Sequence, residues 1–243
     1  FLVAEQVSGV GFRTADRIGR ASGMALDDPR RAAGAVLHLL GAHADNGHVF
    51  ATVDQLQQTG EQLDVPATCI ETAVESLAGR ALLVREEDAV YAAPLYDAEL
   101  EVAATLARRS APGAPQPDAQ ARPPLKAELS DEQVSAVHAT FEARLLVVTG
   151  GPGTGKTTTV RGIVEAHRAA GNRLLLGAPT GRAAKRLSEA SGAEARTIHR
   201  ILEWNPATAS FQRDADNPIE ADLVLIDESS MLNLQLAHSL LQA

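Results

Sequence analysis

One stretch of eight residues, GGPGTGKT from Gly150 to Thr157, constrains this chain more than any other. It matches the phosphate-loop pattern G-x-x-x-x-G-K-[ST] at every fixed position. The apolar run Leu145 to Val148 before it is typical of a buried parallel strand, and a helix is expected from Thr157 to Ala170, closed by Gly171. A strand, a glycine loop and a helix in this order predict a domain that binds a nucleoside triphosphate.

The residue types in the loop suit phosphate groups. Glycines tolerate positive φ and let backbone N–H groups approach a ligand, and the start of the helix adds further donors and the positive end of its dipole. Lys156 is expected to reach the β- and γ-phosphates, and the Thr157 hydroxyl to ligate Mg²⁺. The predicted nucleotide contacts in this stretch are Gly151, Pro152, Gly153, Thr154, Gly155, Lys156, Thr157 and Thr158.

Length and composition limit what surrounds the loop. The chain has 243 residues, 45% of them hydrophobic, which suits one large or two smaller domains with packed cores. No apolar run approaches the roughly 18–20 residues of a membrane span, no signal peptide is visible, and a single cysteine, Cys69, excludes an internal disulfide. We therefore expect a cytoplasmic protein without a membrane partner. The chain starts with Phe1 and stops at Ala243 inside an expected helix, so we interpret it as a piece of a longer protein.

The net charge of −9 argues against nucleic-acid binding until its distribution is considered. Ten acidic residues and two arginines lie between Glu61 and Glu101, whereas five basic and two acidic residues lie between Ala178 and Arg200. A locally basic face is what phosphate binding needs, whatever the total charge.

The first residues contain a turn that resembles a helix-hairpin-helix, assigned to residues 1–28. Gly9 and Gly11 flank one apolar residue, and a helix is expected to open after them. Such a turn offers backbone N–H groups to a DNA phosphate, so Gly9, Gly11, Arg13 and Thr14 are predicted DNA contacts. The alternative is an ordinary glycine turn between packed helices.

Residues 29–109 predict a winged-helix-like helical module. The expected elements are helices over 29–44, 53–63, 67–78 and 94–109 and a hairpin over 81–84 and 89–91. Because the last helix and the wing are acidic, a structural or protein-contact role is favoured over DNA binding. Residues 110–125, rich in Pro, Ala and Gln, are expected to form a linker before an ATPase lobe over 126–243.

The last region alternates helix and strand patterns, as α/β domains with a parallel sheet do. Its final apolar strand, Leu223 to Ile226, ends in Asp227-Glu228 and resembles a Walker B element. Asp227, with Thr157, is then a predicted Mg²⁺ ligand, while Glu228 orients and deprotonates the attacking water and joins Lys156 as a predicted catalytic residue. The alternative, an acidic N-cap pair for the next helix, is less favoured because a phosphate loop precedes it.

Five stretches carry a family resemblance when taken in order. They are LSDEQ at 129–133, GGPGTGKT, APTGRAAKRL at 178–187, TIHRIL at 197–202 and LIDESSM at 225–231. Together they resemble the RecD-like helicases of superfamily 1, in the long, stand-alone form. The resemblance implies an α/β P-loop NTPase with an incomplete RecA-like parallel sheet, preceded by a mainly α helix-hairpin-helix plus winged-helix-like region.

The resemblance also implies roles for single residues. Gln133 would read the adenine edge, and the residues that would contact single-stranded DNA are Pro179, Thr180, Gly181, Arg182, Thr197 and His199. Lys185 and Arg186 would add basic surface. Trp204 or Phe211 could stack a base, although packing against a loop is favoured for each.

The activity implied is 5′→3′ translocation on single-stranded DNA, driven by ATP and Mg²⁺, that separates duplex junctions in repair or recombination. The arginines that complete the ATP site from a second lobe are expected beyond Ala243, so this stretch alone is expected to bind nucleotide, hydrolyse it poorly and not unwind DNA. The alternatives are the helicase part of a conjugative relaxase, a nucleotide-gated DNA-binding module without a motor, and a P-loop NTPase with no DNA role.

Overall fold

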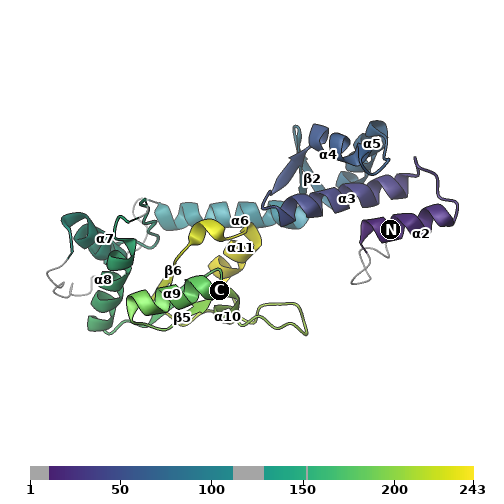
Figure 1. Cartoon of the computed structure of the whole chain (residues 1–243). Helices are drawn as coiled ribbons and strands as arrows, with labels where there is room; N and C mark the ends of the chain where they lie inside the picture. Colours follow the sequence, from purple (N-terminus) through teal and green to yellow (C-terminus); the bar gives the residue numbers. More distant parts are fainter. Residues whose placement is uncertain (1–10, 112–128, 152) are drawn as a thin grey trace. The chain divides into compact units, whose positions relative to one another are not determined.

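The structure, a computed structural model, describes residues 11–111, 129–151 and 153–243 (Figure 1). The chain divides into two compact units, Phe1–Leu100 and Glu101–Ala243, each with its own hydrophobic core. Residues 1–10, which hold the start of the expected helix-hairpin-helix, and the expected linker beyond Ala111 lie outside the described residues. The domain limits expected from the sequence stay predictions.

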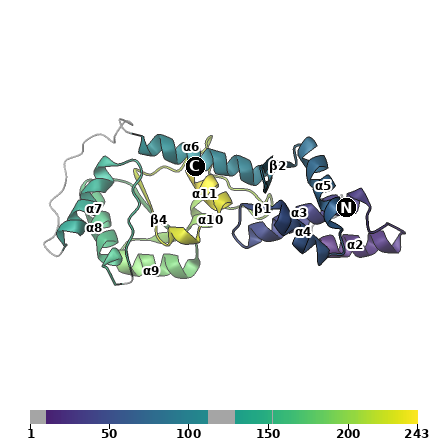
Figure 2. The same cartoon turned by 90° about the horizontal axis from the view of Figure 1, so that it is seen from above.

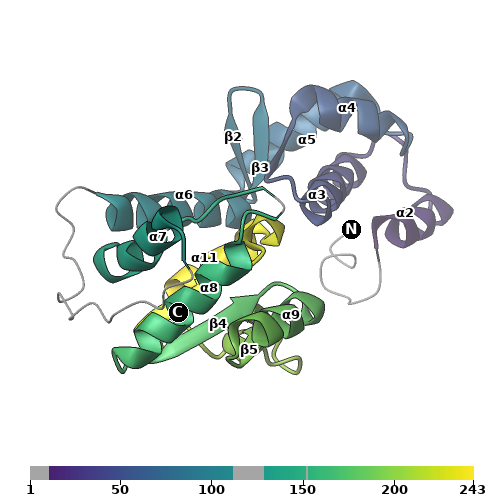
Figure 3. The same ribbon diagram turned by 60° about the vertical axis from the view of Figure 1, so that its left-hand side comes forward.

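The first unit packs helices against a small antiparallel sheet, in which β3 is the central strand. Its elements are α2 (Phe12–Ala21), α3 (Pro29–Asp45), β1 (Phe50–Thr52), α4 (Val53–Glu61), α5 (Ala67–Gly79), β2 (Leu83–Glu86) and β3 (Ala89–Ala92). The hairpin of β2 and β3 stands beside α5 in Figure 3. Three helices and this hairpin are the winged-helix-like arrangement that the sequence predicts.

Local capping explains where these helices begin. Thr52 and Gln55 form a capping box at the start of α4, each side chain bonding the backbone of the other. Asp28 accepts a hydrogen bond from the backbone of Arg30 at 2.9 Å, and Pro29 takes the first position of α3. These bonds join residues two or three apart, so the sequence pattern predicts them.

A buried arginine connects α2 to α3, and no sequence pattern indicates it. The side chain of Arg31 is fully buried and bonds Asp16 at 2.6 Å. It also donates to the carbonyl oxygens of Leu26 at 3.1 Å and Asp64 at 2.8 Å. A buried charge is tolerated only when it is paired and its donors are satisfied, and this arginine meets both conditions.

The second unit contains a parallel three-stranded sheet in the order β5-β4-β6. The strands are β4 (Leu174–Ala178), β5 (Ala195–Thr197) and β6 (Leu223–Ile226). The helices are α7 (Asp131–Glu142), α8 (Lys156–Ala169), α9 (Gly181–Ser191), α10 (Ile198–Ile201), the 3₁₀ turn η1 (Ser229–Met231) and α11 (Leu234–Gln242), and α6 (Ala93–Ser110) runs across the limit between the two units. This is the incomplete RecA-like sheet expected from the sequence.

Helix α8 crosses the sheet antiparallel to its strands. Only residues 170–173 separate the end of α8 from the start of β4, so the two elements run in opposite directions (Figure 3). Ile163 and Ala166, in the second half of α8, pack in one cluster with Leu223, the first residue of β6. The start of α8 therefore points to the carboxyl edge of the sheet, where β4 and β6 end.

The strand expected over Leu145–Val148 is wrong. The structure assigns no strand there and pairs this segment with none of β4, β5 and β6. Leu146, Val147 and Val148 are exposed, Val147 to 71%. An apolar run becomes a buried strand only where a neighbouring strand bonds its backbone and a core covers its side chains, and the three strands described in this unit supply neither.

Within the described residues, no helix has the length and apolar character needed to cross a membrane.

Candidate nucleotide and nucleic-acid site

The phosphate loop needs glycine at two crowded positions. A Cβ on Gly150 would lie 2.6 Å from the Thr154 hydroxyl oxygen, and one on Gly155 would lie 2.5 Å from Nε2 of Gln133. Gly153 and Gly155 also adopt positive φ, 77° and 82°. The left-handed backbone favours glycine at Gly153 and Gly155, and a side chain at Gly150 or Gly155 would displace the Thr154 or Gln133 side chain from the loop.

The loop leads into α8 with its first-turn N–H groups uncapped. Gly155 is the N-cap, and no side chain of the described residues caps this helix start. The Thr157 side chain is exposed, whereas Thr159 is buried and donates to the Gly155 carbonyl at 3.3 Å. Free N–H donors and a helix dipole form an anion site, so the described residues fit a phosphate group. Pro152 lies outside the described residues.

Lys156 lies over the loop that precedes it. Its Nζ donates to the carbonyl oxygen of Gly150 and to that of Gly151, the latter at 3.1 Å. The Thr154 hydroxyl donates to the same Gly151 carbonyl at 2.9 Å. The ammonium group is therefore already held beside the backbone that would surround a phosphate.

Gln133 connects α7 to the phosphate loop. Its Oε1 accepts from the backbone N–H of Ser130 at 3.0 Å, as part of a capping box. Its Nε2 donates to the carbonyl oxygen of Gly155 at 3.4 Å. Helices α7 and α8 lie side by side in both views of the unit (Figures 1 and 2). Its expected role toward adenine stays a prediction.

Asp227 and Glu228 follow β6 directly at the carboxyl edge. The N–H of Asp227 donates to the carbonyl of Gly177 in β4 at 2.9 Å, and its Oδ1 accepts from the N–H of Glu228 at 3.0 Å. Glu228 adopts a left-handed backbone, φ 53°, and its side chain caps nothing in η1. The next helix, α11, is capped by Asn233 instead. Glu228 is thus the N-cap position of η1 by backbone alone, and neither acidic side chain caps η1 or α11.

Two threonines at the same edge are helix caps. The Thr180 hydroxyl accepts from the backbone of Ala183 at 3.2 Å at the start of α9. The Thr197 hydroxyl accepts from the backbone of Arg200 at 3.3 Å at the start of α10. Because β4 and β5 are parallel and pair Ala178 with Thr197, the segment from Pro179 to Arg182 and the exposed His199 follow neighbouring strand ends.

The basic residues of this region divide into paired and unpaired groups. Lys185 bonds Glu189 at 3.9 Å, and Arg196 bonds Glu194 at 2.8 Å and lowers the pKa of that carboxyl group. For three exposed arginines, the described residues supply no hydrogen-bond or ion-pair partner to the guanidinium; these are Arg182, Arg186 and Arg200. The unpaired arginines make this surface available to an anion.

Three aromatic rings gather after α10. The rings of Trp204 and Phe211 lie 4.9 Å apart, and His199 lies 6.2 Å from the first and 5.6 Å from the second. The sequence alone offered no signal that these rings meet, because Phe211 is seven residues beyond Trp204 in an irregular stretch. The loop between them turns back through paired N–H and carbonyl groups of Asn205 and Ser210.

The glycine turn predicted near the N-terminus belongs to the first unit. Gly11 is the N-cap of α2 and is exposed, Arg13 is exposed, and Thr14 is half-buried. Gly9 lies outside the described residues. The DNA contact expected at this turn stays a prediction.

Comparisons with known proteins add to this geometry. Residues 133–243 match the family described as "AAA domain", and residues 1–50 match the "ATP-dependent RecD2 DNA helicase HHH domain". The ATP-dependent RecD2 DNA helicase of Deinococcus radiodurans is 35% identical over 98% of this chain and 36% of its own length. The RecBCD enzyme subunit RecD of Mycolicibacterium smegmatis is 38% identical over 46% of the chain and 25% of its own length. The ATP-dependent DNA helicase dda of Enterobacteria phage T4 is 38% identical over 40% of the chain and 23% of its own length.

Proposed function

This chain belongs to the RecD-like helicases, and we propose that it carries the nucleotide site of an ATP-dependent DNA helicase that moves 5′→3′ along single-stranded DNA. The chain spans about a third of the length of the RecD2 helicase that it matches, so the activity of the whole protein is part of this proposal. One observation supports this proposal most strongly: three features meet at the carboxyl edge of the second unit. The uncapped start of α8 points there, the pair Asp227-Glu228 follows β6, and exposed arginines follow β4 and β5.

The proposed roles in nucleotide chemistry follow from position. The N–H groups of the loop and of the first turn of α8 bind the phosphates, and Lys156 exchanges the carbonyls of Gly150 and Gly151 for phosphate oxygens. Thr157 and Asp227 would hold Mg²⁺, which would neutralise charge developing on the phosphates. Glu228, whose side chain caps no helix, orients the attacking water and accepts its proton.

A short covalent and hydrogen-bonded route joins this chemistry to the proposed DNA contacts. Asp227 bonds Gly177 in β4, and β4 continues within two residues into Pro179 and Thr180. Gln133 contacts the loop from the other side, through Gly155. A change in the nucleotide that moves Asp227 would therefore shift the end of β4 and, with it, the start of α9. We extend the proposal to duplex junctions as substrates and to DNA repair or recombination as the setting.

The test is ATP turnover by the full-length protein with and without single-stranded DNA. We expect turnover that needs Mg²⁺ and rises when the DNA is added, followed by strand separation from a 5′ tail. Turnover that is indifferent to DNA would support the P-loop NTPase with no DNA role instead. DNA-stimulated turnover without strand separation would support the nucleotide-gated module.

A further inference from the structure

We propose that Trp204 is a stacking platform for a base of single-stranded DNA. This proposal rests on the proposed function, because it adds a base contact to the DNA surface at the carboxyl edge. Three observations on the described residues support it: the way α10 ends, the exposure of the indole of Trp204, and the nearby guanidinium of Arg200, which has no hydrogen-bond or ion-pair partner.

The backbone after α10 holds Trp204 beside His199. The helix ends in a Schellman motif, in which the N–H of Trp204 donates to the His199 carbonyl at 2.9 Å and the N–H of Glu203 donates to the Arg200 carbonyl at 3.3 Å. This motif needs a left-handed residue, usually glycine, at the position that Glu203 occupies with φ 54°. A glutamate in this conformation is strained, and strained backbone of this kind often occurs at ligand-binding sites.

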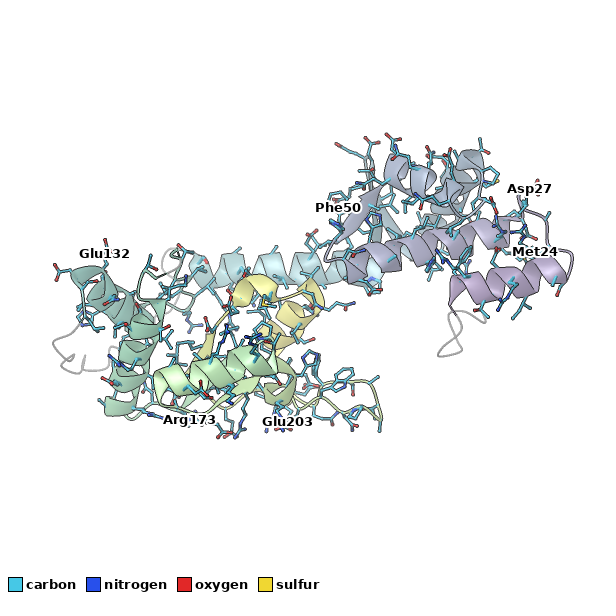
Figure 4. All side chains as sticks on the ribbon, viewed as in Figure 1. Met24, Asp27, Phe50, Glu132, Arg173 and Glu203 are labelled. Carbon is cyan, nitrogen blue, oxygen red and sulfur yellow. The ribbon has the colours of Figure 1, made fainter. Side chains whose placement is uncertain are left out.

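Long-range contacts stabilise this conformation. Arg213 donates two hydrogen bonds to the Glu203 carboxylate, at 2.8 and 3.0 Å. The backbone N–H groups of Gln212 and Arg213 both donate to the Leu202 carbonyl. Figure 4 labels Glu203 at the start of this loop. The end of the loop is thus fixed to the end of α10, which brings Phe211 against Trp204.

The two aromatic side chains of the loop differ in burial. Phe211 packs against the cluster of Ile198, Leu202 and Leu236, and it needs no ligand to explain its position. Trp204 is outside that cluster and keeps 42% of its surface exposed, although the rings of His199 and Phe211 both contact it. A large aromatic surface that stays exposed to solvent beside two neighbouring rings is suited to stack on a base.

The charge near this indole suits a polyanion. Arg200, on the turn before Trp204, is exposed and makes no side-chain hydrogen bond or ion pair with the described residues. The cap residue Thr197 and His199 precede it on the same turn. Stacking surfaces that bind single strands combine an exposed aromatic ring with positive charge along the backbone path, and both are present here.

The chain contains one tryptophan, so emission excited at a wavelength that tyrosine does not absorb reports on Trp204 alone. We would titrate the 243-residue chain with fluorescein-labelled oligo-dT and, separately, with an abasic oligomer of equal length. Anisotropy of the label measures binding, and tryptophan emission measures contact. We expect both oligomers to bind through their phosphates and only oligo-dT to quench the emission.

Two substitutions separate stacking from folding. Trp204→Ala is expected to weaken oligo-dT binding by about 5- to 150-fold and to leave abasic binding unchanged, while Trp204→Phe keeps most of the affinity. Phe50→Ala, which removes a ring of similar exposure, 43%, from the first unit (labelled in Figure 4), is the matched control and should have no effect. Binding of oligo-dT without quenching, or equal loss of abasic binding in Trp204→Ala, would overturn the proposal. If neither oligomer binds, the stacking proposal fails, and DNA-stimulated ATP turnover by the full-length protein decides separately whether the proposed function holds.

Discussion

The backbone N–H of Asp227 donates to the carbonyl oxygen of Gly177 at 2.9 Å, which joins the end of β6 to β4 one residue before β4 ends. A Cβ on Gly177 would lie 2.7 Å from Ile201 and 2.8 Å from Ile226, so only glycine fits between α10 and β6. The acidic pair, the start of α9 and the start of α10 are therefore anchored to one point of the sheet.

Replacing Lys156 by alanine is expected to remove nucleotide binding. The ammonium group lies beside the carbonyls of Gly150 and Gly151 and is the only lysine of the loop. We expect the affinity for a fluorescent ATP analogue, measured by anisotropy, to fall at least tenfold with little change in thermal stability, because the side chain is exposed. The control is Lys185→Ala, which removes an exposed lysine paired with Glu189 and should leave the affinity unchanged.

Replacing Glu228 by glutamine separates turnover from binding. Glutamine keeps the shape of the side chain but accepts a proton far less readily, so the full-length protein should bind ATP normally and lose turnover by about 10²–10⁴-fold. Phosphate release in a steady-state assay is the measurement. Glu220→Gln is the matched control, since Glu220 is exposed and lies 3.7 Å from Arg173. Full activity in Glu228→Gln would mean that another residue activates the water.

Comparing alanine substitutions at two glycines with left-handed backbones separates the effect of backbone strain on stability from the effect of the phosphate loop on nucleotide binding. Gly155→Ala and Gly171→Ala should each lower the free energy of unfolding by about 1–2 kcal/mol, because both positions have φ near 80°. Only Gly155→Ala should also weaken nucleotide binding, because its Cβ would displace the Gln133 amide from the phosphate loop, whereas the space around Gly171 is open. Urea unfolding and nucleotide titration measure the two effects. Normal binding by Gly155→Ala would contradict the geometry of the loop.

The stability of the second unit is expected to depend on His167. Its buried ring stacks on Phe141 at 3.9 Å and bonds Thr140 at 2.7 Å and Asn172 at 2.8 Å. Because the Thr140 hydroxyl donates to a backbone carbonyl, its oxygen accepts from Nε2–H, and Nδ1 accepts from the Asn172 amide. The neutral imidazole therefore has both partners, and burial lowers the pKa of His167 below its ordinary value of 6.5.

The lowered pKa of His167 determines how the stability of the second unit changes with pH. The unfolded chain binds a proton at His167 more readily than the folded chain does, so this contribution to stability is complete above pH 6.5 and is lost as the pH falls below it. Urea unfolding between pH 5 and 8 should show the loss, and His167→Gln should flatten it. His138→Gln, a change at a half-buried histidine on α7, serves as the control. An unchanged pH slope in His167→Gln would contradict this account.

The strained turn at Glu203 can be tested without DNA. Glycine adopts φ near 54° freely and a β-branched residue does not, so Glu203→Val should be less stable than Glu203→Gly by about 1–2 kcal/mol. Both variants lose the ion pair with Arg213, so the difference isolates the backbone. Thermal unfolding followed by circular dichroism is the measurement. Equal stability of the two variants would show that the turn relaxes when the carboxylate is removed.

The sequence by itself determined the local features of this protein. The spacing of GGPGTGKT requires glycine at the left-handed Gly155, and Ser130, Thr52 and Thr180 cap helices through bonds to residues three positions away. The apolar run Leu223–Ile226 predicted β6 closely. These features depend on backbone dihedrals and on neighbours within a few residues, which a sequence pattern describes directly.

Only the tertiary structure decided which distant groups meet. In the structure, Leu145–Val148 has no partner strand, and Arg31 bonds Asp16, fifteen positions away. Gln133 contacts Gly155, and Phe211 packs in a core cluster while Trp204 stays exposed. Strand pairing and burial depend on which surfaces the rest of the chain supplies. An apolar run therefore predicts what a segment can bury, and the packing of distant segments decides whether it is buried.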